Sequence, residues 1–363
     1  MSNLYVDLHV LQTVPPCCVN RDDTGSPKTA QYGGVTRARV SSQAWKHAMR
    51  LMFNDMFRAE DMGKRTKKIV SIVAGEIAKL DPSADSESLA VKALENAGLK
   101  IKSLDKGTDA LFFLSTAQAK ALAELILANS TDKDKKENEK EKKNEYKAAL
   151  KGTPSFDMAL FGRMVADDPS LNYDAAAQVA HSISTHAVHN EYDYYTAVDD
   201  CNEDDQAGAG HIGVAEFSSS TLYRYATVNV RELLQSAGPD TAKVIRCFAE
   251  AFICSMPTGK QNSYANRTYP DAVYITIRKD QPVNLVGAFE KAVQGGENGY
   301  VDESVKRLVE YARKIYTRFS CSPEKSFGMG DGIECIADDM PLNTLLDALE
   351  KSVGELAVAK EVK

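Results

Sequence analysis

Three stretches of the chain alternate between apolar and polar side chains, as half-buried β-strands do. In the first, residues 4–10, apolar side chains occupy the even positions. Residues 222–230 and 272–278 show the same alternation. Paired prolines and paired glycines punctuate residues 15–34, so we expect a loop there.

Apolar residues that recur every three or four positions predict the helices. The clearest one follows Ser41 and Ser42, which form an N-cap signal, and runs to Phe57. Further helices are expected at residues 67–80, 117–127, 175–188, 242–254, 282–293, 302–318 and 342–353. Residues 131–146 are nearly all Lys, Glu, Asp and Asn, which is typical of a solvated helix or loop, and we assign them no function.

The predicted elements run strand, helix, a long helical insertion, and then strand, helix, strand, helix. This order favours an α+β fold with helices packed on a small antiparallel sheet. The length of 363 residues suits about two structural units or one elaborated domain. The 43% hydrophobic content, without a sustained period, excludes a wholly disordered chain, collagen and a coiled coil.

Cysteine usage and hydropathy predict a cytoplasmic protein with no membrane contact. The seven cysteines are odd in number and form no C-x-x-C pair, which argues against a disulfide framework and a zinc knuckle. No apolar run approaches the ~20 residues that a membrane span needs. The first eleven residues also lack the basic and then apolar layout of a secretory signal.

The formal net charge of −7 argues against nucleic-acid binding on average, but the charge is unevenly distributed. Residues 21–50 carry two acidic and six basic side chains: Arg21, Lys28, Arg37, Arg39, Lys46 and Arg50. This segment runs into the predicted N-terminus of a helix, where Ser41, Ser42 and free backbone N–H groups could hold an anion.

Other features of the same segment suit a phosphate backbone. Gln43, Lys46 and Arg50 are spaced three and four apart, so they form one polar stripe on the helix. Gly33 and Gly34 would let the backbone approach a ligand closely. These are the parts of a cradle for a phosphate backbone, but a capped surface helix with solvated cations explains them equally well.

A second region has the opposite charge. Residues 164–223 contain eleven acidic residues and no Lys or Arg. The region would repel phosphates, but its aromatic residues could stack on bases or wedge between them. These aromatic residues are Tyr192, Tyr194, Tyr195 and Phe217. For any one of them, a place in the core or in a protein interface is the more common alternative.

Four of the six histidines fall in this acidic region, so a metal site must be considered. His181, His186 and His189 do not converge on one helical face as an i, i+4 pair would. Buried or interface histidines are therefore the preferred interpretation. The competing hypothesis is a metal-dependent RNA endonuclease that uses these three residues with nearby aspartates.

No convincing catalytic set is present. Residues 257–260 read Pro-Thr-Gly-Lys like the end of a P-loop, but Gln261 stands where Ser or Thr would bind magnesium. A turn that presents Lys260 to a phosphate remains reasonable. The chain also lacks a G-x-S-x-G elbow and paired carboxylates at helix spacing beside a histidine. We therefore expect a protein without enzymatic activity, cofactor or metal.

A set of sequence blocks occurs in order from residue 1 to about residue 290. They are Leu8-His9-Val10-Leu11, Asn20-Arg21-Asp22-Asp23, Gly33-Gly34, Arg39-Val40-Ser41-Ser42-Gln43 with Lys46 and Ala48-Met49-Arg50, Gly162-Arg163-Met164, His181 to His186, Tyr195 to Asp200, Glu216-Phe217-Ser218-Ser219 with Tyr223 to Ala226, and Pro257-Thr258-Gly259-Lys260-Gln261. Together these blocks are highly specific, and the chain resembles the CasC family, the backbone subunit of the type I-E CRISPR surveillance complex, Cascade.

The resemblance implies an RRM-like, ferredoxin-like palm with a large helical finger insertion and a β-hairpin thumb. By this resemblance the palm comprises residues 1–58 and 223–363, the finger residues 59–190 and the thumb residues 191–222. Several copies would line up head to tail along one CRISPR RNA with other Cascade subunits. Each thumb would kink the RNA at regular intervals, so that the bases between the kinks can pair with target DNA.

The resemblance also implies roles for individual residues. Contacts to phosphate or sugar are expected from Arg21, Lys28, Arg39, Ser41, Gln43, Lys46 and Arg50, with Lys260 nearby. Arg37 and Phe217 complete the expected RNA-binding set. Met164 and Tyr195 would form the wedge at the kink, where a base leaves the stack.

Overall fold

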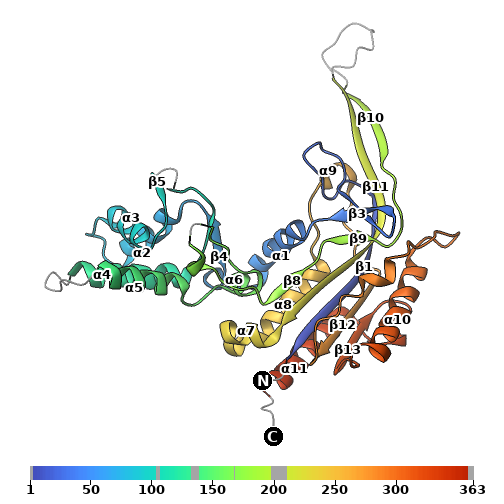
Figure 1. Ribbon diagram of the computed structural model, residues 1–363. Helices are drawn as coiled ribbons and strands as arrows, with labels where there is room; N and C mark the ends of the chain where they lie inside the picture. The colour runs from blue at the N-terminus through green and yellow to red at the C-terminus, as the bar shows by residue number, and fades with distance from the viewer. Residues whose placement is uncertain (1–2, 104–106, 132–138, 167, 198–210, 359–363) are drawn as a thin grey trace. The chain divides into compact units, whose positions relative to one another are not determined.

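The computed structural model describes residues 3–103, 107–131, 139–166, 168–197 and 211–358 (Figure 1). The chain divides into two compact units, which we describe separately. Unit 1 comprises Met1–Met52, Val179–Arg231 and Ile245–Lys363, and unit 2 comprises Phe53–Gln178 and Glu232–Val244.

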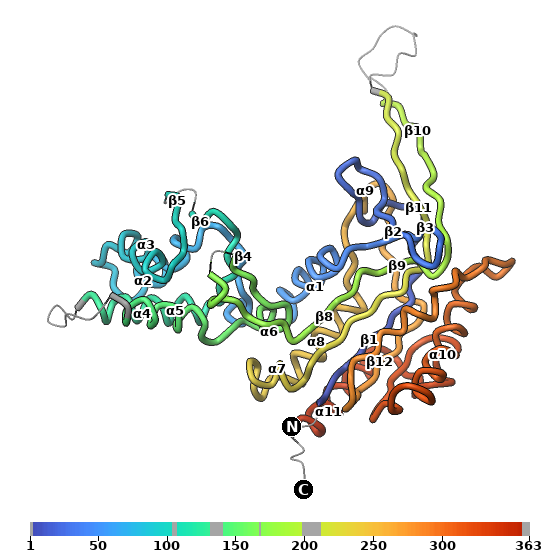
Figure 2. Tube along the Cα trace, viewed as in Figure 1, coloured from blue at the N-terminus to red at the C-terminus, as the bar shows by residue number. Residues whose placement is uncertain are grey.

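Unit 1 is built on a large, mainly antiparallel sheet. Its strands are β1 (Tyr5–Cys17), β2 (Thr29–Tyr32), β3 (Val35–Val40), β9 (Ser182–Ser184), β10 (Glu191–Ala197), β11 (His211–Asn229), β12 (Ala272–Arg278), β13 (Lys325–Met329) and β14 (Asp338–Asp339), and β8 (Ala177–Val179) spans the boundary between the units. Among the described residues the sheet order is β14-β13-β12-β1-β11-β9-β3-β2. Strand β10 pairs with the N-terminal part of β11 and forms a long hairpin with it (Figure 2).

The helices of unit 1 lie on both faces of this sheet. They are α1 (Ser42–Met56), α8 (Thr241–Cys254), α9 (Gln261–Tyr264), α10 (Val301–Arg318), α11 (Leu342–Val358) and the 3₁₀ segments η4 (Leu285–Phe289) and η5 (Ile333–Cys335). Helices α1 and α8 extend into unit 2, helix α7 (Val230–Ala237) lies mostly in unit 2, and the 3₁₀ segment η3 (Gly238–Asp240) lies wholly in it. On the even-numbered face of β1, Val10 lies opposite Arg224, whose guanidinium stacks on Trp45 of α1, 3.7 Å from the ring centroid, and contacts Phe252 of α8.

The opposite face of β1 buries a polar network under α10 and η4. The Tyr225 hydroxyl donates to the Asp7 carboxylate (3.0 Å), and burial raises the pKa of Asp7 to about 6. The His9 ring stacks against Tyr223, Tyr225 and Tyr274, and burial lowers the pKa of His9 to about 3. Leu308 of α10 belongs to the same hydrophobic cluster as the three tyrosines, so this face of the sheet is closed.

Unit 2 is mainly helical. Its elements are η1 (Ala59–Asp61), β4 (Gly63–Thr66), α2 (Ile69–Leu80), α3 (Ser86–Asn96), β5 (Ile101–Ser103), β6 (Gly107–Thr108), β7 (Phe112–Ser115), α4 (Thr116–Thr131), α5 (Glu139–Lys151), α6 (Phe156–Phe161) and η2 (Pro169–Leu171). One hydrophobic cluster joins α2, α3, α4 and α5 through residues such as Val73, Leu94, Leu122 and Leu150. No helix in the described ranges is long and apolar enough to cross a bilayer.

The mixed α+β class is confirmed, and so are most elements with a strong periodic pattern. The expected strands at 4–10, 222–230 and 272–278 lie in or largely within β1, β11 and β12. The helix predicted after Ser41 is α1, and the helices predicted at 67–80, 117–127, 242–254, 302–318 and 342–353 correspond to α2, α4, α8, α10 and α11. The charged run at 131–146 lies partly in α5 and partly outside the described residues.

Three local predictions are wrong. Residues 175–188 are not a helix but contain strands β8 and β9, because pairing with neighbouring strands prevails over local helix propensity. Only Leu285–Phe289 is helical within 282–293, as a short 3₁₀ segment capped by Asn284. The expected loop at 15–34 contains the end of β1, where Pro15 and Pro16 occupy an irregularity in the pairing, and all of β2.

Candidate nucleic-acid interface

The loop between β1 and β2 is an ordered turn that displays cations. The Asp22 carboxylate accepts hydrogen bonds from the Thr24 backbone N–H (2.9 Å) and the Ser26 backbone N–H (3.1 Å), which holds the turn closed. Arg21 forms an isolated β-bridge with Pro27, so the turn is anchored on both sides. As a result the exposed Arg21 and the half-buried Lys28 stand at the two ends of one rigid loop.

The turn between β2 and β3 does not match its expected role. Tyr32 pairs with Val35, so Gly33 and Gly34 form a two-residue hairpin turn, and both have positive φ (60° and 78°). A Cβ at Gly33 would overlap the carbonyl oxygen of Glu290. The close backbone approach that glycine permits here is thus made to another part of the protein and not to a ligand.

Arg37 is buried, in contrast to the prediction that it binds RNA. Its side chain is 0% exposed, and burial lowers its pKa. The guanidinium donates to the backbone carbonyls of Ser184 (2.9 Å) and Phe289 (2.8 Å), and also to those of Tyr32 and Glu290. Arg37 therefore joins three segments of unit 1, and we assign it a structural role.

The N-terminus of α1 is the centre of the candidate interface. The Ser41 hydroxyl caps the helix by accepting from the Ala44 backbone N–H (3.4 Å), and the Ser41 backbone N–H donates to the Asn20 side chain (2.9 Å). Ser41 itself is buried, so it shapes the helix end more than it offers its hydroxyl to a ligand.

One face of α1 continues this surface. Gln43, Lys46 and Arg50 are three and four residues apart, so they lie on one side of α1. Gln43 is exposed, and Lys46 and Arg50 are half-buried. Burial lowers the pKa of Lys46. Long basic side chains that lie along apolar surface keep only their charged heads in water, which suits contacts to a polymer that runs past the helix.

His181 joins Arg39 to the end of α1. The His181 Nδ1 atom lies 3.3 Å from the Ser42 backbone nitrogen and 3.4 Å from an Arg39 guanidinium nitrogen. Arg39 also donates to the Thr29 carbonyl (3.0 Å), so its orientation is fixed from two sides. Partial burial, Arg39 and Lys28 together lower the pKa of His181.

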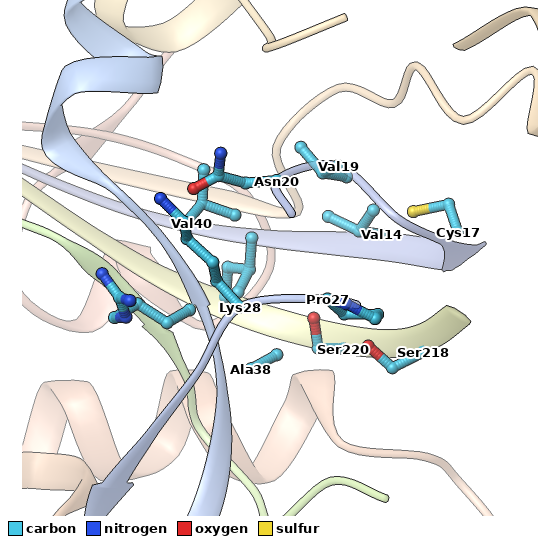
Figure 3. Close-up of a pocket in the computed structure, with 12 residues that line it drawn as sticks. Val14, Cys17, Val19, Asn20, Pro27, Lys28, Ala38, Val40, Ser218 and Ser220 are labelled. Carbon is cyan, nitrogen blue, oxygen red and sulfur yellow. The ribbon is translucent and has the colours of Figure 1, made fainter. Parts of the chain in front are cut away.

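A small cavity of about 30 Å³ lies beside these residues (Figure 3). Its lining includes Asn20, Lys28 and Arg39 as well as the buried strand residues Cys17 and Ser218. Figure 3 shows Lys28 and Asn20 at one side of the cavity and Cys17 and Ser218 at the other. The volume accommodates about two water molecules and excludes a base or a sugar. A nucleic acid would therefore lie across this surface and not inside it.

Lys260 and Arg21 both lie near the Cys18 thiol. Burial raises the pKa of Cys18, Arg21 and Lys260 act in the opposite direction, and Asp22 and Glu216 raise it further. Lys260 is exposed and has a positive φ of 52°. A Cβ at Gly259 would overlap the backbone of Val19, so glycine lets this turn pack directly on the segment after β1. The Gly259–Lys260 turn therefore lies against the start of the cationic loop.

The two faces of the β10–β11 hairpin carry different side chains. Tyr192 and Tyr194 lie opposite Glu216 and Val214 on one face, and both tyrosines are exposed. Tyr195 lies opposite Gly213 on the other face and is 45% exposed. A Cβ at Gly213 would overlap the Tyr195 ring, so this glycine lets the ring lie across β11.

Phe217 lies on the same face as Tyr195, at the base of the hairpin. It pairs with Glu191, and its ring centroid is 6.1 Å from that of Tyr264 in α9. Phe217 is half-buried, and this contact supports the base of the hairpin. The segment 198–210, between the two strands, lies outside the described residues.

Met164 belongs to unit 2 and is 83% exposed. Its neighbour Arg163 is buried and donates to the carbonyls of Leu171 (2.9 Å) and Leu150 (2.9 Å), and burial lowers the Arg163 pKa to about 10. Backbone hydrogen bonds in both directions link Arg163 to Tyr173. An anchored arginine thus stands next to an apolar Met164 side chain that is exposed to solvent.

The histidines do not form a metal site among the described residues. No group of three His, Cys, Asp or Glu residues with ligand geometry occurs in the described ranges. Both ring nitrogens of His186 are engaged, Nδ1 with the Ala187 carbonyl (2.8 Å) and Nε2 with the Thr221 backbone N–H (3.1 Å). His189 is exposed, and the side chain of His211 lies outside the described residues. This geometry gives the endonuclease hypothesis no support.

Comparison with known proteins identifies the family. The family model for CT1975-like proteins matches residues 6–350. The chain belongs to the CT1975-like protein family. No curated protein sequence matches the chain.

Two solved structures are similar to this family member along almost its whole length. One chain, from a "CRISPR RNA-guided surveillance complex, pre-nicking", is 29% identical with a TM-score of 0.77, and the match covers 96% of this chain and 100% of that one. A chain from a second "CRISPR RNA-guided surveillance complex" is 27% identical with a TM-score of 0.62, and the match covers 96% and 99%. The resemblance to the CasC backbone subunits of Cascade is therefore confirmed.

Proposed function

We propose that this chain is a non-catalytic backbone subunit that binds CRISPR RNA within a Cascade surveillance complex. The observation that carries the proposal is the full-length similarity to chains of RNA-guided surveillance complexes. The cations around the N-terminus of α1 supply the physical reason, because an RNA backbone needs fixed positive charge and hydrogen-bond donors.

The proposed palm is RRM-like. Strands β12, β1, β11 and β9 lie side by side in that order, with α1 between β1 and β9 in the chain and α8 between β11 and β12. This is the strand order of the ferredoxin-like fold. An RRM stacks bases on aromatic residues of the exposed sheet face, but here α10 and η4 bury those positions. We therefore place the RNA at the α1 end of the sheet and not on its face.

The cradle for the RNA backbone consists of Arg21, Lys28, Arg39, Lys46, Arg50 and Lys260, with Gln43 as an uncharged donor. The expected contact from Ser41 is left out, because its backbone N–H donates to Asn20 and its buried hydroxyl caps the helix. Each cation that neutralises a phosphate releases a counterion, so affinity should fall steeply with salt. Arg37 is left out of this set because its guanidinium is fully engaged inside the protein.

The β10–β11 hairpin is the proposed thumb. We propose that Tyr195 inserts where a base leaves the stack, with Phe217 behind it. We also propose that Met164, in unit 2, contacts RNA at a kink with its apolar side chain. The partial exposure of Tyr195 and the high exposure of Met164 support these roles. A regular kink would leave the bases between kinks ordered for pairing with target DNA, so that pairing reads the sequence and the protein reads the backbone.

Copies of the chain would polymerise head to tail along the RNA in the cytoplasm, together with other Cascade subunits. A head-to-tail contact joins two different surfaces of the same protein. The acidic residues of the hairpin region and the basic cradle of a neighbouring copy are suited to such a contact, because complementary charge fixes the polarity of association.

The test separates this scaffold from the metal-dependent RNA endonuclease. The purified full-length chain is incubated with single-stranded RNA, with magnesium or manganese and, in parallel, with a chelator. We expect binding and protection of the RNA under both conditions. Metal-dependent cleavage by the wild-type chain, absent from a His181→Ala/His189→Ala variant, would instead favour the endonuclease.

A further inference from the structure

The proton on the His181 ring can be assigned from its neighbours. Nδ1 faces the Ser42 backbone N–H and the Arg39 guanidinium, and both groups can only donate. Nδ1 must therefore accept from both and carries no proton. The neutral ring then has its proton on Nε2, which makes Nε2 a hydrogen-bond donor.

The charges around His181 keep the ring neutral. Arg39 reaches it from β3, Lys28 from the loop before β2, and the partial positive charge of the α1 N-terminus lies at Nδ1. A second proton would remove both hydrogen bonds at Nδ1 and add a cation beside two others. Accordingly, partial burial and these two cations lower the pKa of His181.

The Nε2 side of the ring is available to a ligand. His181 is exposed, and no other residue in the described ranges forms a hydrogen bond with Nε2. A metal ion would need a lone pair at Nε2, where the proton sits, and would meet two neighbouring cations. The ligand that fits is an anionic oxygen, because it accepts from Nε2–H and is attracted by Arg39 and Lys28.

We propose that His181 is an RNA-positioning residue that donates its Nε2–H to a phosphate oxygen held by Arg39 and Lys28. The assignment rests on the proposed function and adds to it an uncharged, directional contact. The two cations attract the phosphate from a distance, whereas the imidazole fixes where one oxygen lies. His181 thus belongs to the RNA interface and not to a metal site.

Two substitutions separate the two sides of the ring. In His181→Asn the amide oxygen can take the place of Nδ1 and keep the contacts to Ser42 and Arg39, but no donor reaches the position of Nε2. In His181→Gln the amide nitrogen can reach the position of Nε2, while the acceptor at Nδ1 is lost. Binding of a single-stranded RNA oligonucleotide to the full-length chain is measured by fluorescence anisotropy at several salt concentrations, and thermal melting checks folding.

We expect His181→Asn to weaken RNA binding by about five- to tenfold, with an unchanged melting temperature and an unchanged salt dependence, since no charge is removed. His181→Gln should bind RNA within about twofold of the wild type. Equal affinity of all three proteins, or equal weakening in both variants, would overturn the assignment. A slope of log affinity against log salt that is shallower by about 0.7 in His181→Asn would also overturn it, because that change marks a lost cation. If the wild type itself fails to bind RNA, the proposed function fails as well.

Discussion

Removal of two cations from the polar stripe of α1 gives the most quantitative test of the cradle. Lys46 and Arg50 lie one turn apart, and both are half-buried along the helix. Alanine is at least as good a helix former as either residue, so Lys46→Ala/Arg50→Ala should leave α1 intact. The variant removes two of the six cations that we assign to the RNA backbone.

The expected effect follows from counterion release. For single strands each neutralised phosphate contributes about 0.7 to the slope of log affinity against log salt. Six cations predict a slope near −4 for the wild type, and four predict a slope near −3 for the variant, if each meets one phosphate. Between about 50 and about 200 mM salt the wild type should lose about 300-fold in affinity and the variant about 50-fold.

The assay is fluorescence anisotropy of a labelled single-stranded RNA titrated with the full-length chain. The matched control is Lys306→Ala/Lys314→Ala, which removes two exposed lysines from α10 and should leave the slope unchanged. A slope for Lys46→Ala/Arg50→Ala that equals the wild-type value, in a protein with an unchanged melting temperature, would refute the reasoning. An equal change in the α10 control would do so too, because the charge effect would then not be local.

Three further predictions concern the hairpin, a buried cation and the buried network. Tyr195→Ala should leave folding unchanged and alter nucleotide flexibility at regular intervals along the bound RNA, measured by chemical probing. Tyr192→Ala, on the opposite face, should leave nucleotide flexibility unchanged. Identical reactivity profiles for Tyr195→Ala and the wild type would remove Tyr195 from the wedge. Arg37→Leu should lower the free energy of unfolding by about 3 kcal/mol, measured with urea, because it leaves buried carbonyls without donors; a normal stability combined with a shallower salt dependence of RNA binding would restore Arg37 to the cradle. His9→Phe keeps the stacked ring and removes a base whose pKa burial lowers to about 3. Below about pH 6.5 the folded wild type therefore binds fewer protons than its unfolded chain, and it loses stability as the pH falls. The free energy of unfolding of the variant minus that of the wild type should increase by about 1.4 kcal/mol for each unit that the pH falls from 6 to 4, and a constant difference would contradict the reasoning.

The sequence correctly predicted the elements that are long and have a clear periodic pattern of apolar residues. Strand β1 alternates because one face carries apolar side chains while the other carries Asp7 and His9. The structure buries both faces, where the alternation predicted a half-buried strand. Helices α1 and α10 carry apolar stripes that match their buried faces. Long periodic segments of this kind keep their structure in many surroundings. Their positions along the chain were sufficient to suggest the α+β class.

Short strands could not be predicted because their stability comes from partners far away in the sequence. Ser182–Ser184 pairs with both β3 and β11, and its three residues are too few to show a detectable alternation. The hairpin turn at Gly33 and Gly34 is typical of a two-residue β-turn, but the strand that follows it, Val35–Val40, contains two arginines and resembles a cationic loop.

The sequence predicted the charge of the candidate site but not the direction in which each basic side chain points. The cations of residues 21–50 could be found by counting, and the structure places most of them at the surface around the end of α1. Arg37 and Arg39 are two positions apart, yet one guanidinium binds buried carbonyls and the other reaches His181. That difference depends on Phe289, Glu290 and His181, which lie more than 140 residues away in the chain.

The central claim is that this chain holds CRISPR RNA without cutting it, and one measurement tests this claim most directly. The full-length chain is produced together with a CRISPR RNA and its partner subunits, the assembly is purified, and the bound RNA is extracted and sequenced after nuclease treatment. The account predicts one RNA of defined length that is protected from the nuclease along its length and is equally intact in a sample without nuclease. An assembly that contains the chain but no RNA, or RNA cut at regular positions by the chain itself, would contradict it.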